Sequence, residues 1–471
     1  MTAKNASADA ATPTIRGGKY YITLIVASMM VFSMYFGAGN LIFPPMLGAH
    51  AGEAFTPAII GFLLAGVLLP VISVIAVAVT GDSITDMSNR GGKVFGIVFP
   101  ILVYLSIGAL YAVPRTAVVS YGSGFVPISG VDNKASLVIY CIVFFVISAA
   151  LAWNSNSIID NLGKFLTPAL LFLLAVMIIM SFVRLDSQAL PPAEDYAAPM
   201  SAGLIQGYAT MDSLAALAFG ILVVTSLRYK RVGEGPRLVR SVSAAAIGAG
   251  ILLALVYIGL GIIGKNLADG RSYKDGASLL AASAHEIMGT PGMYALGAIV
   301  FLACLTTSVG LIGSTSEFFN EIAPGISYHA WVIIFSVIAL GISSLGLTAV
   351  LSVAAPIIGF LYPAAMTLVL ITLVEPLFGR KLFWTYRISL YVAIIWAGLM
   401  SLNSLGWGSA VIEPLISWAP GHSNDLGWWL PVLTAAIVGL ILDFTTRKKE
   451  DIQVGVATLH EDEPVEAAVT A

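Results

Sequence analysis

The chain has 471 residues, of which 58% are hydrophobic and only 10% are charged, and its net charge is −3. Soluble domains carry about 25% charged residues, so this composition excludes an ordinary soluble protein. It predicts an all-α polytopic membrane protein whose surroundings are the lipid bilayer. We expect no nucleic acid among its partners.

Membrane-crossing helices need about 20 mostly apolar residues, and the chain offers twelve such segments. They cover approximately residues 20–48, 55–79, 94–121, 136–152, 162–183, 203–226, 241–264, 293–316, 329–346, 348–375, 383–404 and 427–446. The sequence therefore predicts twelve transmembrane helices.

The basic residues give an independent prediction of orientation, because Lys and Arg accumulate in cytoplasmic loops. With both termini inside, most of the 23 Lys and Arg residues fall on the inner side, and the loop 228–240 is the most basic. The outer side then holds Lys134, Arg184, Lys265, Arg271 and Lys274. We expect a multi-pass membrane protein with both termini in the cytoplasm.

The first span is interrupted at residues 36–45, where a membrane helix should be most regular. Pro44 and Pro45 supply no N–H, and their rings would clash with the carbonyls of Asn40 and Leu41 in a continuous helix. Gly37, without a Cβ, permits an unwound chain and a close approach of a ligand. Irregular backbone at membrane depth survives where it lines a cavity. The stretch therefore resembles the broken helix of a secondary transporter, with a simple proline kink as the alternative.

In the third span, Arg115 follows Pro114, and the proline frees the carbonyl of Leu110. Arg115 is a candidate gate residue or a contact for a substrate carboxylate. Snorkelling of its long side chain to the membrane surface is the structural alternative.

The sixth span places polar groups in the middle of an apolar segment, at residues 206–213. An ionisable group at this depth costs several kcal/mol unless it is paired or faces water, so Asp212 is expected to have a role. It could balance a substrate ammonium, help to bind a cation or form an ion pair with Arg115. A purely structural Asp212–Arg115 pair is the alternative.

The eighth span contains the adjacent hydroxyls of Thr306 and Thr307. Hydroxyls in membrane helices usually bond to their own backbone, but hard cations prefer oxygen ligands. Together with carbonyls freed in the first span, the pair would form a sodium site.

In the preceding outer loop, residues 265–292, the sequence predicts a short helix near 277–282. This helix either covers a vestibule or serves as a connector. In the tenth span, Pro356 and Pro363 predict a bend.

The remaining reactive side chains give no cofactor site. Cys141 and Cys304, the only cysteines, lie in different predicted spans and indicate no disulfide framework. The histidines lie in loops, at span ends or in the tail, without a His/Glu cluster at metal-ligand spacing. We expect no cofactor, and a zinc-dependent membrane protease is disfavoured.

Residues 37–45, 114–117 and 210–212 together resemble the bacterial branched-chain amino acid:cation symporters of the BrnQ type. The resemblance implies sodium-coupled uptake of leucine, isoleucine and valine, and the LeuT-like fold. In that fold spans one to five and six to ten form inverted repeats, spans one and six are unwound, and two further helices follow. The implied units are residues 19–183, 184–376 and 377–446, between cytoplasmic tails at 1–18 and 447–471.

The resemblance also implies site residues. The substrate-binding positions that it implies are Gly37, Ala38, Gly39, Asn40 and Thr210, and the sodium ligands are Ser33, Phe36, Asn40, Ala303, Thr306 and Thr307. Two further substrate-binding candidates come from the residues themselves: Tyr208, for the aliphatic side chain, and Asp212. The better-known amino acid carriers have a small polar residue in place of Asp212, so the ion count is open. Proton coupling through Asp212 is an alternative. A polytopic membrane enzyme is another, but it would need a cluster of acidic residues or histidines at one interface, which the sequence lacks.

Overall fold

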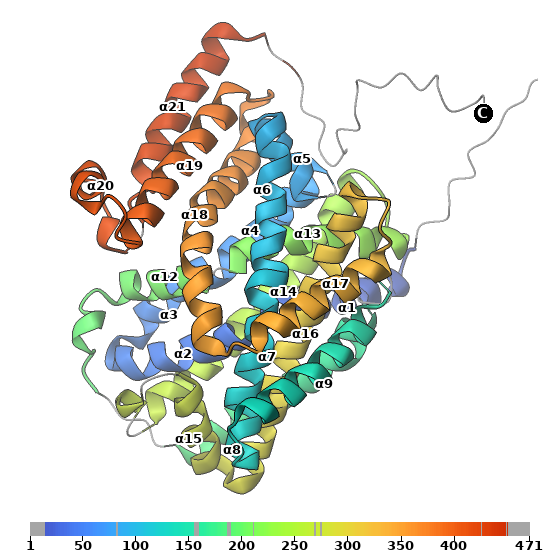
Figure 1. The fold of residues 1–471 in the computed structure, drawn as a ribbon, viewed down its shortest axis with the longest axis vertical. Helices are drawn as coiled ribbons and strands as arrows, with labels where there is room; N and C mark the ends of the chain where they lie inside the picture. The colour runs from blue at the N-terminus through green and yellow to red at the C-terminus, as the bar shows by residue number, and fades with distance from the viewer. Residues whose placement is uncertain are drawn as a thin grey trace, which may run out of the picture.

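The computed structural model describes residues 15–81, 83–154, 160–185, 190–210, 212–267, 270–273, 276–424, 426–448 and 450, without the side chains of 38, 277, 347–356 and 358. Over these residues the regular elements are helices (Figure 1). Within this described part of the chain, ten helical stretches are long and apolar enough to cross a membrane. The predicted all-helical, multi-pass architecture is confirmed. Most of the two predicted tails, and the side chain of Pro356, lie outside the described residues.

The helical first half of the chain is interrupted near residues 36–37 and bends near residues 106–111. Its main helices are α1 (Gly18–Tyr35), α2 (Ala38–Ala51), α3 (Phe55–Leu63), η2 (Leu64–Leu68), α4 (Leu69–Thr80), α5 (Ile84–Ser88), α6 (Lys93–Leu105), η4 (Ser106–Leu110), α7 (Ala112–Val119), η5 (Ser120–Phe125), α8 (Val126–Ser129), α9 (Lys134–Ala152), η7 (Asn161–Leu166) and α11 (Thr167–Arg184).

The second half repeats the pattern of a broken helix followed by long ones. Its main helices are α12 (Pro199–Ala209), α13 (Asp212–Tyr229), α14 (Pro236–Asn266), α15 (Gly276–Met288), α16 (Thr290–Ile322), α17 (Tyr328–Ser343), α18 (Leu347–Val374), α19 (Trp384–Ser404), α20 (Ser409–Ile416) and α21 (Trp429–Thr446). In Figure 1, α19 and α21 form a hairpin beside α18 at one edge of the bundle.

The predicted interruption of the first span is confirmed, but it is shorter than expected. Helix α1 ends at Tyr35 and is capped by Phe36 (φ −73°, ψ 80°). The extended Gly37 (φ −102°, ψ −166°) then leads directly into α2. Gly39 and Asn40 therefore lie in the first turns of α2, and both prolines are accommodated inside this helix. The sixth span is likewise divided between α12 and α13, next to Thr210.

Glycines hold α2 against α14 at backbone contact. A Cβ at Gly264 would collide with the carbonyl of Pro45, and one at Gly48 would collide with the carbonyl of Gly261. This packing fixes the depth at which the first turns of α2 face α14.

The third span bends ahead of Pro114. Residues of η4 form a π-helical turn in which Gly108 leaves the helical region (φ −77°, ψ −106°), and Tyr111 follows at φ −138°. A Cβ at Gly108 would lie 2.5 Å from the Thr315 hydroxyl, so only glycine fits this turn. The bend directs the next helix, α7, and its Arg115 toward the centre of the bundle.

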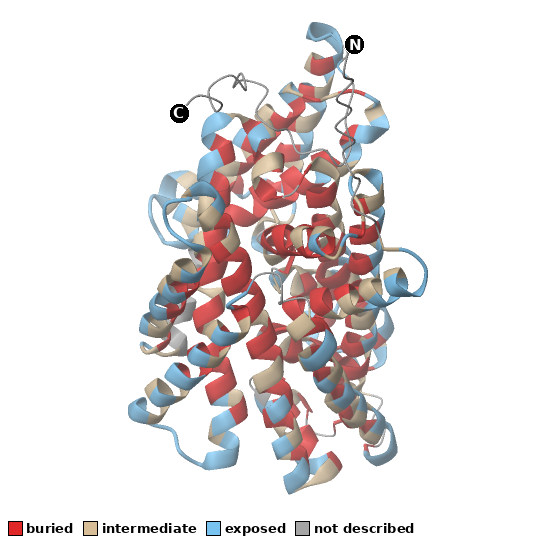
Figure 2. Cartoon of the chain, turned by 90° about the vertical axis from the view of Figure 1, so that its right-hand side faces the viewer, coloured by how far each residue is buried: buried red, intermediate tan, exposed pale blue. Residues whose placement is uncertain are grey.

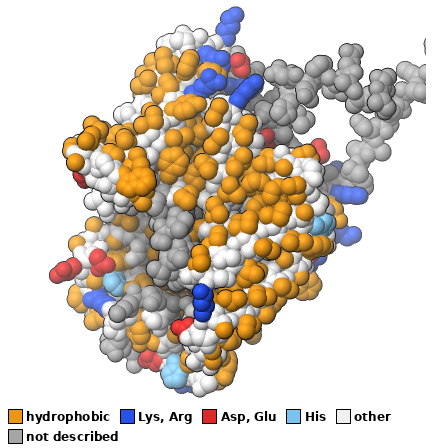
Figure 3. Space-filling model, in the orientation of Figure 1, with side chains coloured by type: hydrophobic (Ala, Val, Ile, Leu, Met, Phe, Trp, Pro, Cys, Tyr) orange, Lys and Arg blue, Asp and Glu red, His pale blue; other side chains and the backbone are white. Residues whose placement is uncertain are grey.

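The surface fits a bilayer. Figure 2 shows buried residues concentrated in the middle of the bundle, and Figure 3 shows hydrophobic side chains over the flank, with charged ones mainly toward its two ends. The exposed large apolar side chains belong to helices from both halves of the chain, such as Ile139, Phe172, Leu255 and Ile437.

Candidate functional site

Asn40 is the central side chain of the site, and it connects three elements. Its Oδ1 accepts a hydrogen bond from the Gly37 N–H (3.3 Å), across the break in the first span. Its Nδ2 donates to Asp212 Oδ2 and to the Tyr257 hydroxyl, each at 2.5 Å. Only 4% of Asn40 is exposed. The amide therefore joins the first span to α13 and α14 inside the bundle.

Asp212 occupies the first turn of α13, directly after the second break. The free N–H groups and partial positive charge of a helix N-terminus stabilise a carboxylate there. Thr210, at the end of α12, donates its hydroxyl to the Gly207 carbonyl at 2.8 Å. Both breaks thus bring polar groups to the same depth.

Tyr257 is a functional candidate that the sequence reasoning missed. It is fully buried in α14, and its ring packs against Phe36 (ring centroids 6.1 Å apart) and Phe62 (5.3 Å). An aromatic residue in an apolar helix carries no local signal that separates it from the core. Its contact with Asn40 arises from the tertiary packing of α2 on α14.

Arg115 lies against the first turn of α2. Its Nη1 donates to the Tyr111 hydroxyl at 2.7 Å, and its guanidinium carbon lies 5.5 Å from the centre of that ring. A Cβ on Gly39 would occupy the position of the guanidinium, so glycine is required for this approach. Among the ion pairs of the described residues, none joins Arg115 to Asp212.

A cavity of about 80 Å³ lies between these groups. Asn40, Thr210 and Asp212 form one polar part of its wall, Arg115 forms another, and the remainder is largely apolar, including Ile107, Leu214 and Leu311. Gly37 and Gly39 contribute backbone to the same wall. The space is large enough for several water molecules, and it offers a cation, an anion and an apolar surface to one small ligand.

Tyr208 is placed elsewhere. Its ring packs edge-on to Tyr362 with the centroids 4.3 Å apart, and its hydroxyl accepts a hydrogen bond from Trp428 Nε1 at 3.3 Å. It is not among the residues that line the cavity. The structure therefore brings Gly37, Gly39, Asn40, Thr210 and Asp212 together but leaves Tyr208 outside this group, while the side chain of Ala38 is not described.

The predicted sodium ligands other than Asn40 lie on the α1 side of the first break and in α16. The Thr306 hydroxyl donates to the carbonyls of Ser33 (2.9 Å) and Ala303 (3.1 Å), and the Thr307 hydroxyl lies 3.4 Å from the Ser33 carbonyl. Thr307 also lines the cavity, and its Oγ1 would lie 3.0 Å from a Cβ built on Gly37. Phe36 stacks on Phe32 with centroids 5.2 Å apart. No group of three or more His, Cys, Asp or Glu residues able to hold a metal occurs in the described part of the chain.

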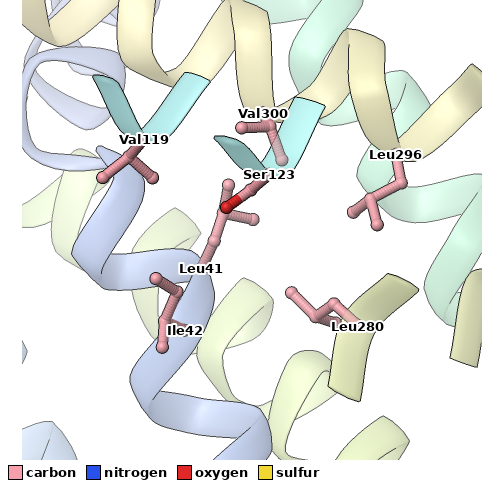
Figure 4. A pocket seen from close by; sticks show the side chains of 7 residues that line it. All are labelled: Leu41, Ile42, Val119, Ser123, Leu280, Leu296 and Val300. Carbon is pink, nitrogen blue, oxygen red and sulfur yellow. The ribbon is translucent and has the colours of Figure 1, made fainter. Parts of the chain in front are cut away.

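A narrow apolar crevice lies beside α2, one residue beyond Asn40. Figure 4 shows Leu41 and Ile42 facing Leu280 of α15, with Leu296 and Val300 of α16 across from them. The short helix predicted in the outer loop is thus present as α15, and it covers this side of α2. The crevice measures only about 10 Å³, so the apolar side chains close this route in the present conformation.

Comparisons with known proteins show the family of the chain. The family described as "Branched-chain amino acid transport protein" matches residues 21–446. The branched-chain amino acid permease BrnQ of Corynebacterium glutamicum is 49% identical over 440 residues, which cover 92% of this chain and 99% of the permease. The branched-chain amino acid permease BraB of Bacillus subtilis is 34% identical over 431 residues, covering 89% and 95%.

The fold also has a counterpart among solved structures. Mhp1, a nucleobase-cation-symport-1 family transporter in a closed conformation with bromovinylhydantoin bound, has a TM-score of 0.56 and 14% identity, covering 89% of this chain and 91% of Mhp1. At this identity the likeness concerns the fold alone.

Proposed function

This chain belongs to the branched-chain amino acid transport protein family, and we propose that it imports leucine, isoleucine and valine by sodium symport with alternating access. Its curated relatives are permeases and its structural neighbour is a transporter, so the protein is a transporter and not an enzyme. One observation carries the proposal: a single buried cavity presents Arg115, Asp212 and an apolar wall together.

A free amino acid is a zwitterion, and the cavity complements both of its charges. Asp212 receives the ammonium group, and Asn40 holds the carboxylate of Asp212 in place through the 2.5 Å hydrogen bond. Arg115 receives the substrate carboxylate, because a guanidinium presents a planar pair of donors to it. The backbone at Gly37 and Gly39 is open to the same group. Opposed charges without a direct ion pair leave room for the zwitterion between them.

The apolar wall of the cavity recognises the aliphatic side chain of the substrate. Ile107, Leu214 and Leu311 offer dispersion contacts but no hydrogen-bonding group to an aliphatic chain. An apolar pocket distinguishes neighbouring alkyl chains by only about 1 to 3 kcal/mol per methylene. Overlapping transport of leucine, isoleucine and valine therefore follows, with rejection of polar side chains.

Sodium is assigned to the group formed by the carbonyls of Ser33, Phe36 and Ala303 and the hydroxyls of Thr306 and Thr307. Both hydroxyls lie within 3.4 Å of the Ser33 carbonyl. A hydroxyl hydrogen rotates freely, so each oxygen can turn a lone pair toward a cation in place of its present acceptor. Oxygen ligands of this kind suit a hard cation. An inward membrane potential of about 100 mV adds roughly 2.3 kcal/mol per charge moved.

Proton coupling is the second candidate, and the position of Asp212 favours it. A buried carboxyl group bonded to Asn40 and near the Tyr257 hydroxyl can carry a proton in place of a cation. The two mechanisms differ in which gradient drives uptake.

The proposed topology has twelve spans in a LeuT-like arrangement, with inverted repeats at residues 19–183 and 184–376, two further helices at 377–446 and both tails in the cytoplasm. It is supported by the broken helix near the start of each half and by the likeness in fold to Mhp1. The distribution of Lys and Arg supports the orientation in the bacterial plasma membrane.

Uptake of labelled leucine by purified protein in liposomes tests the proposal. An inward sodium gradient at equal pH should drive accumulation, with valine and isoleucine as competitors and with no effect of glutamate. If a pH gradient drives uptake and a sodium gradient does not, the coupling is to protons. If neither gradient changes leucine uptake, the symport mechanism is refuted.

A further inference from the structure

A second cavity, of about 260 Å³, opens beside the start of α1 and shares no lining residue with the substrate cavity. Its polar wall contains Lys19 of α1, Asp160 and Lys164 at the start of η7, and Lys230 after α13. Its apolar wall includes Ile22 and Val26, about one turn apart on α1. Nothing in the transport mechanism uses these groups.

The charges of this cavity do not balance. Asp160 bonds both Lys230 (2.7 Å) and Lys164 (3.0 Å). Partial burial acts to raise the pKa of Asp160, but its bonds to the two ammonium groups outweigh burial and hold the pKa below the ordinary value. Lys19 forms no ion pair with any residue that the structure describes. One carboxylate therefore faces three ammonium groups, and the cavity has a positive surplus.

The apolar wall continues onto the lipid-facing surface. Ile22 is 61% exposed, and Ile25 on the same helix is 57% exposed. On its other side α1 is fixed, because Tyr20 hydrogen-bonds Ser241 of α14 at 3.0 Å. The lysine-bearing face of α1 thus meets both the cavity and the hydrocarbon, at the end of the molecule where the basic residues gather.

We propose that this cavity binds the headgroup of one anionic phospholipid, with its phosphate at Lys19, Lys164 and Lys230 and its glycerol and first methylenes along Ile22 and Val26. Basic pockets between membrane helices on the cytoplasmic side suit such headgroups. Free phosphate has the same charge chemistry but gains nothing from the apolar wall. The combination of both walls is the reason for choosing the lipid.

The bound lipid would join α1 to η7 and to the end of α13. In the protein alone, α1 already rests on this region: the Thr167 hydroxyl donates to the Met29 carbonyl at 3.1 Å, and a Cβ on Gly163 would collide with the Val26 carbonyl. Since α1 carries Ser33 and ends at the first break, a lipid that fixes α1 stabilises the present conformation.

Native mass spectrometry of the purified full chain, titrated with phosphatidylglycerol, tests this assignment. Lys19→Gln and Lys230→Gln should each lower the affinity about fivefold, which corresponds to about 1 kcal/mol for one lysine at an anionic surface. Asp160→Asn removes the competing carboxylate and should raise the affinity. Lys93→Gln, an exposed lysine at the start of α6, is the matched control and should change nothing.

Competition experiments distinguish the phosphate of a lipid headgroup from free phosphate. Millimolar inorganic phosphate or glycerol phosphate should leave phosphatidylglycerol bound and should not shift the melting temperature, whereas the lipid should raise it in the wild type more than in Lys19→Gln. If inorganic phosphate displaced phosphatidylglycerol as effectively as glycerol phosphate did, the ligand of this cavity would be a free anion and the lipid assignment would be wrong. Equal lipid retention in the wild type, Lys19→Gln and Lys230→Gln, with all three folded, would refute the site.

Discussion

Asn40→Ala is the sharpest test of the substrate cavity, because this amide joins both broken helices and α14. The substitution removes the donor to Asp212 and the donor to Tyr257, each at 2.5 Å. A hydrogen bond to a charged group contributes about 1.5 to 3 kcal/mol. If that bond orients Asp212 for the substrate ammonium, its loss weakens leucine binding by about tenfold to a hundredfold, since 1.4 kcal/mol is a factor of ten.

The assay is leucine binding to purified protein across sodium concentrations, with the melting temperature measured alongside. Asn161→Ala is the matched control, because that amide donates to the Leu151 carbonyl (3.2 Å) and is not among the cavity residues. It should leave leucine affinity unchanged even if it lowers the melting temperature. Leucine affinity within twofold of wild type in Asn40→Ala, with an unaltered sodium dependence, would refute the assignment of Asn40.

Four further predictions follow from the same geometry. Thr307→Ala should raise the sodium concentration for half-maximal uptake several-fold, because it removes an oxygen near the Ser33 carbonyl; an unchanged sodium curve would remove this hydroxyl from the ion site. Arg115→Lys keeps the charge but loses the planar fork, so the KM for leucine should rise about tenfold, and an unaltered KM would exclude a carboxylate contact. Tyr208→Phe should leave leucine affinity within twofold, because the ring lies outside the cavity; a large loss would restore it to the substrate site. Asn40→Ala combined with Thr307→Ala should depart from additivity by at least 0.5 kcal/mol in leucine binding at fixed sodium, and strict additivity would separate the two sites.

The break in the first span could be predicted from the residues because its cause is local: glycine at position 37 disturbs an otherwise apolar helix. The polar run around Thr210 marked the sixth span as unusual, but the division of that span was implied only by the family resemblance. The prolines were a less direct guide. Pro44 and Pro45 lie inside α2 rather than at its break, and this helix packs on α14 in backbone contact.

Features that depend on distant segments could not be predicted in the same way. Tyr257 looks like any buried aromatic residue until α14 is placed against α2. Asp443 is a second example: this fully buried carboxylate of α21 accepts hydrogen bonds from the backbone N–H groups of Phe383, Trp384 and Thr385, and so caps the start of α19. Asp212 and Asp443 are both buried acids in membrane helices, yet one faces a cavity and the other completes a helix end. Only the three-dimensional partners distinguish them.

The first break gives a physical reason why ion and substrate binding should depend on each other. The Ser33 carbonyl precedes it and receives Thr306 and Thr307, while the Gly37 N–H follows it and is held by Asn40. Thr307 is also part of the cavity wall. A cation that orders the chain from Ser33 to Gly37 therefore also orders the end of α2 on which Asn40 and Gly39 meet the substrate. By reciprocity of linked equilibria, if the proposed cation raises the affinity for leucine, leucine must raise the affinity for the cation by the same factor.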